Sequence, residues 1–297
     1  MDRIIFQLHI FPWAQIRDLE LRGLSTVTDP SIYRILEHCP NLSSLTYDCA
    51  DWDPSVDEYE LVPNEIKQTS YLRHLTIDLW RSFYEPPNDT LISLLLSSLT
   101  LPAVESIIIR SQSRQSFDVF PGDWSSKETQ SFFQRSKCAL TRLSLEDISL
   151  SDEDTLALFE LLPSLVDLTI HEPYQFENLD NSPIITSNVI QRLTSVDCGS
   201  SSSDSPTLFP KLERINFTVL GDTVGGTFDD RGFADMIRSR WLPDQVVIFN
   251  IAEVICLHYL KLCIVGRPLS VEAELDLMLL QQDGLCVILL EGDLETE

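Results

Sequence analysis

The chain has 297 residues, of which 43% are hydrophobic, and its 46 acidic and 21 basic side chains give a formal net charge of −25. That length suffices for one large domain or two ordinary ones. Binding to phosphate backbones or anionic membranes needs clustered Lys and Arg, and no such cluster occurs, so we expect no nucleic acid and no membrane among the partners. The acidity either keeps a Leu-rich protein soluble or attracts basic partners, and both explanations stay open.

The N-terminal residues and the cysteines indicate the compartment. Residues 1–15 predict a short N-terminal cap strand, and residues 1–10 lack the apolar region and small-residue cleavage site of a signal peptide. The seven cysteines are an odd number and include no Cys-x-x-Cys pair, so reduced thiols are expected. No apolar run is long enough to cross a bilayer. We therefore expect an intracellular protein, cytoplasmic or nuclear.

The pattern Leu-x-x-Leu-x-Leu recurs along the chain. The first copy is Ile16-x-x-Leu19-x-Leu21, and further copies begin at residues 42, 72, 104, 140, 165, 212, 257 and 285. Alternate side chains of a strand face opposite sides, so the last two apolar positions of a copy point into a core and the residue between them points away. The last copy is Leu285-x-x-Ile288-x-Leu290, which predicts Ile288 and Leu290 as core residues.

Helix signals stand between most of the copies. Helix-capping residues precede apolar runs with helical spacing, and the expected starts are Asp29, Asn88 or Asp89, Ser125, Ser151 and Ser270. Residues 189–193 and 233–241 mark two more helices. Loops are predicted at residues 48–60, 111–124 and 199–205, and residues 244–256 fit either a strand or the start of a buried helix.

These elements predict the fold class. One strand-and-helix unit cannot bury its own apolar face, whereas stacked copies can. The sequence therefore predicts an α/β leucine-rich-repeat solenoid over residues 16–291, with a curved parallel sheet on the concave side and helices on the convex side. The steps between copies are uneven, and the usual Asn or Cys after the last strand leucine is absent, so irregular repeats are expected. Residues 292–297 are an acidic tail.

Catalytic motifs are missing from the chain. It contains no Gly-x-Ser-x-Gly, His-Glu-x-x-His or phosphate-loop pattern, and Gly221–Gly226 predicts a turn. Asp152–Asp154 lacks the spaced ligands of a calcium loop and suits a helix N-terminus, and His38–Cys39 lacks a second pair for zinc. We expect no enzyme activity, no metal and no cofactor, and a hydrolase is a remote alternative.

The concave face of a curved repeat array is its usual binding surface. A middle row of residues there reads Glu20, Thr46, Thr76, Ile108, Ser144, Thr169, Asn216, Lys261 and Leu289. Thr and Ser also suit strands for structural reasons, so this row is ambiguous. The next row ends with Cys263 and Glu291. Charged residues are the better candidates for partner contact, namely Asp48, Asp78, Arg110, Arg142, Glu146 and His171.

Five segments carry a family resemblance: Pro12–Leu21, Cys39–Leu42, Leu162–Leu165, Leu208–Leu212 and Arg238–Pro243. Through them, roughly residues 10–290 resemble the leucine-rich-repeat region of the fungal F-box protein family. The resemblance implies a protein–protein interaction module that selects substrates for a ubiquitin ligase, in which an F-box docks on a cullin adaptor complex. No F-box segment is seen before the first copy. A stand-alone scaffold or inhibitor without a ligase link is the alternative.

Overall fold

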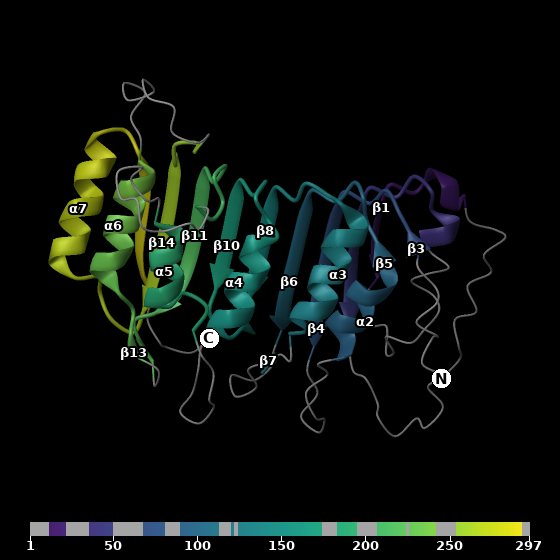
Figure 1. The fold of residues 1–297 in the computed structure, drawn as a ribbon, viewed down its shortest axis with the longest axis horizontal. Coiled ribbons are helices and arrows are strands. Elements are labelled where there is room, and N and C mark those ends of the chain that lie inside the picture. Colours follow the sequence, from purple (N-terminus) through teal and green to yellow (C-terminus); the bar gives the residue numbers. More distant parts are fainter. Residues whose placement is uncertain are drawn as a thin grey trace.

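The structure is a computed structural model, which describes residues 12–21, 36–49, 68–80, 90–112, 120–121, 124–173, 183–194, 207–223, 226–241 and 254–292. It confirms the α/β class, because nine parallel strands form one sheet with helices beside it (Figure 1). The strands are β1 (Asp18–Leu21), β2 (Ser44–Cys49), β4 (His74–Trp80), β6 (Ser106–Gln112), β8 (Arg142–Glu146), β10 (Asp167–His171), β11 (Arg214–Leu220), β14 (Tyr259–Val265) and β15 (Cys286–Gly292).

The strands stand in the sheet in the order in which they occur in the chain. Parallel neighbours cannot be joined by a tight hairpin, so each connection must cross back to the start of the next strand. The helices lie on these crossovers, in one layer in front of the sheet in Figure 1. They are α2 (Thr90–Ser98), α3 (Ser126–Ser136), α4 (Asp152–Glu160), α5 (Ser187–Leu193), α6 (Asp230–Arg240) and α7 (Val271–Gln282), and each contacts the next.

Side-chain caps begin five of these helices. Ser151 is the N-cap of α4, and its hydroxyl accepts the N–H of Asp154 at 3.1 Å. Ser125 and Ser270 cap α3 and α7 in the same way, which confirms the three serine caps predicted from the sequence. Thr186 and Asp229 cap α5 and α6. Gly284, with φ of 111°, follows the end of α7, a conformation that glycine adopts without a Cβ penalty.

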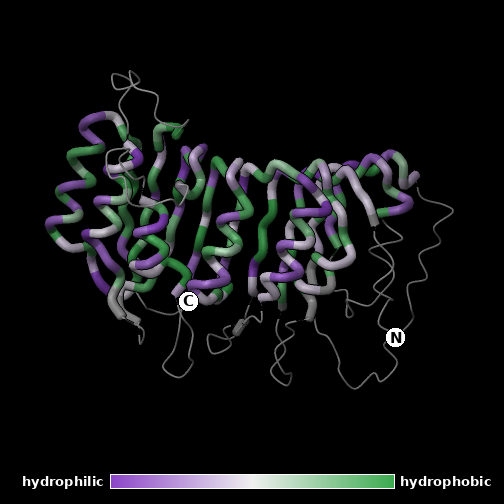
Figure 2. Tube along the Cα trace, viewed as in Figure 1, coloured by the Kyte–Doolittle hydropathy of each residue, from purple (hydrophilic) through white to green (hydrophobic). Residues whose placement is uncertain are grey.

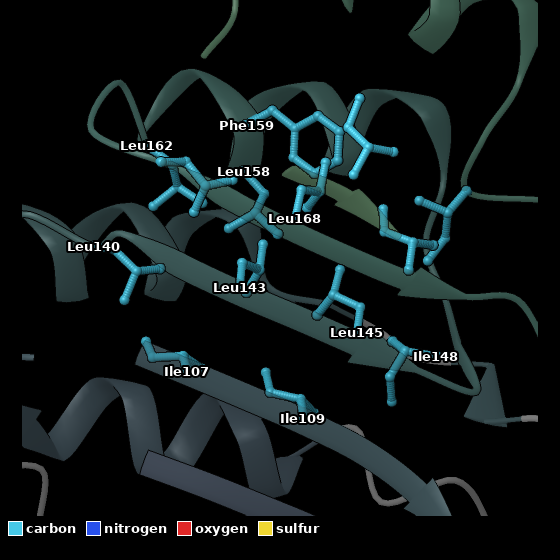
Figure 3. Close-up of a cluster of buried hydrophobic side chains, with 14 of the residues drawn as sticks. Ile107, Ile109, Leu140, Leu143, Leu145, Ile148, Leu158, Phe159, Leu162 and Leu168 are labelled. Atoms are coloured by element: carbon cyan, nitrogen blue, oxygen red, sulfur yellow. The ribbon is translucent and has the colours of Figure 1, made fainter. Parts of the chain in front are cut away.

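The core lies between the sheet and the helix layer. Alternate residues of each strand point into it, so Leu143 and Leu145 of β8 are 4% and 0% exposed. Figure 3 shows these leucines between Ile107 and Ile109 on one side and Leu158, Phe159 and Leu168 on the other. In Figure 2 the central strands carry hydrophobic colours, whereas the helices alternate between hydrophobic and hydrophilic segments. Burial of this continuous apolar layer is the main stabilising term of the fold.

The same backbone hydrogen bonds recur where the strands begin. The carbonyl of Glu105, just before β6, accepts the N–H groups of Thr141 and Arg142 at 2.9 and 3.0 Å. The carbonyl of Thr141 in turn accepts those of Val166 and Asp167. The equivalent carbonyls of Arg17, Ser43, Arg73, Val166 and Glu213 also accept two N–H groups each from the next strand. These bonds hold neighbouring strands in one common register.

The register of the ninth strand differs from the sequence prediction. Leu260 of β14 pairs with Val287, and Lys261 pairs with Ile288. Val287 and Leu289 therefore face the core, while Ile288 and Leu290 are 38% and 46% exposed. The prediction that Ile288 and Leu290 are core residues is wrong. On the opposite face, Ile288 and Leu290 take the positions that the sequence assigned to Leu289 and Glu291.

The predicted chain ends and loops are only partly described. In the expected cap strand, residues 1–11 lie outside the described residues, and Trp13–Gln15 form a short 3-10 helix, η1, instead of a strand. The two-residue strands β7 (Phe120–Pro121) and β9 (Ile148–Ser149) pair with each other, as do β3 (Gln68–Thr69) and β5 (Leu99–Thr100). Of the loop predicted at residues 48–60, residues 48–49 belong to β2 instead, and the rest lies outside the described residues. The expected loop at 199–205, the helix starts at Asp29 and at Asn88 or Asp89, and most of 244–256 also lie outside them.

The predicted turn at Gly221–Gly226 is partly described. The short strands β12 (Asp222–Thr223) and β13 (Gly226–Thr227) pair antiparallel on either side of residues 224–225, which lie outside the described residues. This pairing is compatible with the turn that the glycine-rich stretch predicts.

Candidate binding face of the sheet

Five of the six charged candidates share one row across the open face of the sheet, the face opposite the helices. Asp48, Asp78, Arg110, Glu146 and His171 occupy equivalent positions of five successive strands, β2, β4, β6, β8 and β10. Adjacent strands lie about 4.8 Å apart, so neighbouring members of this row can interact directly. We call these five residues the charged row. The side chain of Asp48 lies outside the described part, although its backbone register is described.

Arg110 is the centre of the charged row. Its Nε lies 2.9 Å from Oε2 of Glu146, and its Nη1 lies 3.8 Å from Oδ1 of Asp78. The hydroxyl of Ser144 donates to the other carboxylate oxygen of Glu146 at 2.8 Å. The side chain of Asp78 is 12% exposed and that of Arg110 is 38% exposed. The guanidinium thus joins two carboxylates while keeping part of its surface open to solvent.

His171 ends the charged row. Burial lowers the pKa of its imidazole, the nearby charges of Lys261 and Arg110 act in the same direction, and only the carboxylate of Glu146 raises it. The imidazole is therefore neutral near pH 7. A neutral imidazole both donates and accepts one hydrogen bond, so His171 offers a partner two kinds of contact.

Asp147 follows the charged row directly. It adopts φ of 57°, and its N–H donates to the carbonyl of His171 at 2.9 Å. Burial raises the pKa of its carboxyl to about 6, and the adjacent charge of Glu146 also raises it. The strand end beside Glu146 therefore holds a second acid that ionises less readily than an ordinary aspartate.

The sixth candidate, Arg142, belongs to a different row. It pairs in register with Ser106 of β6 and Asp167 of β10, and it is exposed. Burial raises the pKa of Asp167, while the cations of Arg214 and Arg142 oppose that shift. The sequence analysis listed Arg142 among the candidates for partner contact, and the structure places it on the same face, four residues before Glu146 on β8.

Two further residues of that row extend the open face and were missed from the sequence. The guanidinium of Arg214 lies 4.7 Å from the ring centre of Tyr259 on the neighbouring strand β14. Its Nε also lies 3.5 Å from Oδ2 of Asp167. The signal that could have found them is the register itself, because both residues hold the same copy position as Arg142.

Charge is distributed unevenly along the open face. The first three strands carry the acids Asp18, Glu20, Asp48 and Asp78 at open-face positions, and the later strands carry Arg110, Glu146, Arg142, Asp167, Arg214 and Lys261. One end of the face is therefore acidic, and the other end presents several cations. A binding partner with the opposite arrangement of charges would be oriented along the sheet.

A second polar place is a hollow of about 590 Å³ at the first turns of α5, α6 and α7. Two of its charged groups, Arg267 and Asp230, bind each other. Arg267 donates from Nη1 to Oδ2 of Asp230 at 2.9 Å and from Nη2 to Oδ1 at 2.8 Å. Burial raises the pKa of Asp230, but hydrogen bonds from Arg267 and Ser270 more than offset it and leave the pKa lowered. This pair joins α6 to the start of α7.

Metal and membrane features can be assessed over the described part of the chain. No three His, Cys, Asp or Glu side chains there come together in a way that could hold a metal ion. None of the helices described above combines the length and apolar composition that crossing a bilayer requires.

Comparisons with known proteins find no counterpart: no protein-family model, no curated protein and no solved structure matches the chain. The case for a function therefore depends on the arrangement of its own residues.

Proposed function

We propose that this chain is a leucine-rich-repeat solenoid that binds a protein on the open face of its sheet and has no enzymatic activity of its own. Three observations support the repeat architecture. The strands follow chain order, their apolar positions are in common register, and the same carbonyl accepts two N–H groups before most strands. Strand-and-helix units that contact only their neighbours are typical of such arrays.

The charged row is the single observation that favours binding on the open face. A purely structural face needs no ion pairs, yet Arg110 lies between Asp78 and Glu146, and His171 follows on the next strand. These side chains can supply oriented hydrogen bonds and charge complementarity to a protein surface.

The resemblance to F-box proteins supports a more specific role as the substrate-recognition part of a ubiquitin ligase receptor inside the cell. In that role the open face holds the substrate, and a cullin adaptor complex binds elsewhere. The alternative, a scaffold or inhibitor without a ligase link, uses the same face. The two differ only in whether the adaptor complex binds.

The experiment has two separate arms. Proteins captured by the immobilised wild-type chain are compared with those captured by Arg142→Ala plus His171→Ala, and by Lys127→Ala, an exposed change on α3 in the helix layer. We expect the double variant to lose a captured protein that Lys127→Ala retains. Equal capture by all three chains would move the binding site away from the open face. In the second arm, failure to bind a purified cullin adaptor complex would leave the scaffold or inhibitor role.

A further inference from the structure

The last helix, α7, has two apolar faces. Ala273, Leu277 and Leu280 are buried against the sheet side. Val271, Leu275, Met278 and Leu279 are 71%, 56%, 43% and 55% exposed. A surface helix ordinarily carries charged and polar residues on its outer face, and a helix that is apolar all round is normally covered. The outer apolar residues of α7, which we call the α7 stripe, therefore need an explanation.

Exposed apolar residues are concentrated at this end of the molecule. Among the described residues, eight large hydrophobic side chains are exposed, and six of them lie on α7 or β15. The α7 stripe follows the spacing i, i+4, i+7 and i+8, so it forms one continuous line along the helix. Figure 1 shows α7 at the end of the helix layer, where α6 is its one neighbouring helix among those described.

The charges around the α7 stripe are acidic. By helical geometry, Glu272 and Glu274 lie on opposite sides of Val271 and Leu275, and Asp283 follows at the C-cap. The cations described beside α7 are used in ion pairs: Arg238 of α6 pairs with Asp235 and with Asp276 of α7, the latter at 2.7 Å, and Arg267 pairs with Asp230. An apolar line with acid on both sides is complementary to an amphipathic helix whose apolar face is flanked by Lys or Arg.

The charge and the length of the α7 stripe indicate which kind of molecule can bind it. A second copy of this chain would bring another acidic stripe and another net charge of −25 to the contact, which repulsion disfavours. The twelve residues of α7 span about 18 Å, the length that a single partner helix of similar size covers. We propose that the α7 stripe is a docking site for a basic amphipathic helix of another protein, separate from the open face of the sheet.

The test uses a helical model peptide of Leu and Lys, about 18 residues long, with its leucines on one face. Its fluorescence anisotropy is measured against the full chain, beside a peptide of the same composition in scrambled order. We expect the amphipathic peptide to bind roughly tenfold more tightly than the scrambled one, because only the former presents a continuous apolar face. Equal binding would show that net acidity alone attracts the peptide and would overturn the proposal.

Matched variants locate the site. Leu275→Gln plus Leu279→Gln keeps the charge and the helix propensity but removes half of the α7 stripe, and it should weaken peptide binding roughly tenfold. Tyr71→Gln, at a residue that is 71% exposed and far from α7 in the chain, should leave binding unchanged. Glu272→Gln plus Glu274→Gln should weaken binding and reduce its salt dependence. Thermal melts confirm that each variant is folded.

Two outcomes would contradict the assignment. If the leucine variant binds the peptide as tightly as the wild type, the α7 stripe is not its site. If sedimentation shows that the wild type forms a dimer which the leucine variant abolishes, a second copy covers the α7 stripe, and the proposal of a basic partner fails. Neither outcome affects the open face, because none of these substitutions touches the charged row.

Discussion

Nε of Arg110 lies 2.9 Å from Oε2 of Glu146 on the neighbouring strand, and the same guanidinium reaches Asp78 on the other side. Arg110→Ala would remove the cation that lies between these two partly buried carboxylates. We expect a loss of about 1–2 kcal/mol in unfolding free energy, between the values typical of exposed and buried ion pairs. Urea denaturation measures it, and Arg142→Ala, an exposed change on the same face, should cost less than about 0.5 kcal/mol. Equal losses in the two variants would mean that the Arg110 pairs contribute nothing.

The ninth strand offers a direct test of register. Leu143 is 4% exposed, so Leu143→Ala should lower the unfolding free energy by roughly 2–5 kcal/mol through lost burial and a cavity. In the sequence pattern Ile288 is the equivalent of Leu143 in the ninth copy. In the structure, however, it is 38% exposed. Ile288→Ala should therefore cost less than about 1 kcal/mol. Comparable losses in urea melts would restore the register predicted from the sequence.

Arg240 is a fully buried cation that holds three segments together. Its guanidinium donates from Nε to the carbonyl of Leu193 at 2.6 Å, and from its other nitrogens to the carbonyls of Phe209 and Leu208. Arg240→Ala should cost about 3–5 kcal/mol, because three buried carbonyls each lose a hydrogen bond from the guanidinium. Arg238→Ala, two residues away with a half-exposed side chain, should cost less than about 1 kcal/mol. Similar thermal melts for the two variants would contradict this role.

Glu172 should make stability depend on pH. Its carboxylate is 3% exposed and accepts the N–H groups of Ile185 and Leu220. Burial raises the pKa of this group from 4.5 to about 7, although hydrogen bonds from the backbone oppose the shift. The folded state therefore holds the proton more tightly than the unfolded state does. The stability that this proton contributes is fully present below the ordinary pKa and is lost as the pH rises to the folded value.

The magnitude of that loss is roughly 3 kcal/mol between the ordinary and the raised pKa. Urea melts across this pH range, for the wild type and for Glu172→Gln, measure it as a difference between the two curves. The side chain of the variant cannot ionise at this position. The unfolding free energy of the wild type should therefore fall, relative to that of the variant, as the pH rises. Parallel curves would show that Glu172 titrates normally in the folded protein.

The order of the strands and the starts of the helices could be predicted because each rests on a local signal. A polar residue separates Leu143 from Leu145, so the alternation selects one face, and Ser151 stands directly before an acidic helical turn. The ninth copy lacks this contrast, since residues 285–290 are all apolar or cysteine. In this ninth strand the register is marked by a backbone hydrogen bond, in which the N–H of Cys286 donates to the carbonyl of His258.

The sequence predicts which residues lie next to one another in the candidate site, but it does not predict which ion pairs they form. Equivalent copy positions place Asp78, Arg110 and Glu146 side by side, but which carboxylate the guanidinium approaches more closely depends on side-chain conformation. One feature of the sequence points to the burial of Arg240. It follows Phe233 and Ile237 at helical spacing, which places it on the core face of α6. That signal is weak, because an arginine at such a position usually reaches solvent along its stem.

The agreement between chain order and sheet order has a consequence for how the protein is made. Each strand binds partners that are close to it in the sequence, so β1 and β2 can pair before the segment containing β15 has been synthesised. The sheet can then grow one strand at a time behind the emerging chain. Until the last strand is added, the most recently made strand of every intermediate presents an edge that awaits its next partner, and this edge is where a chaperone would act during synthesis.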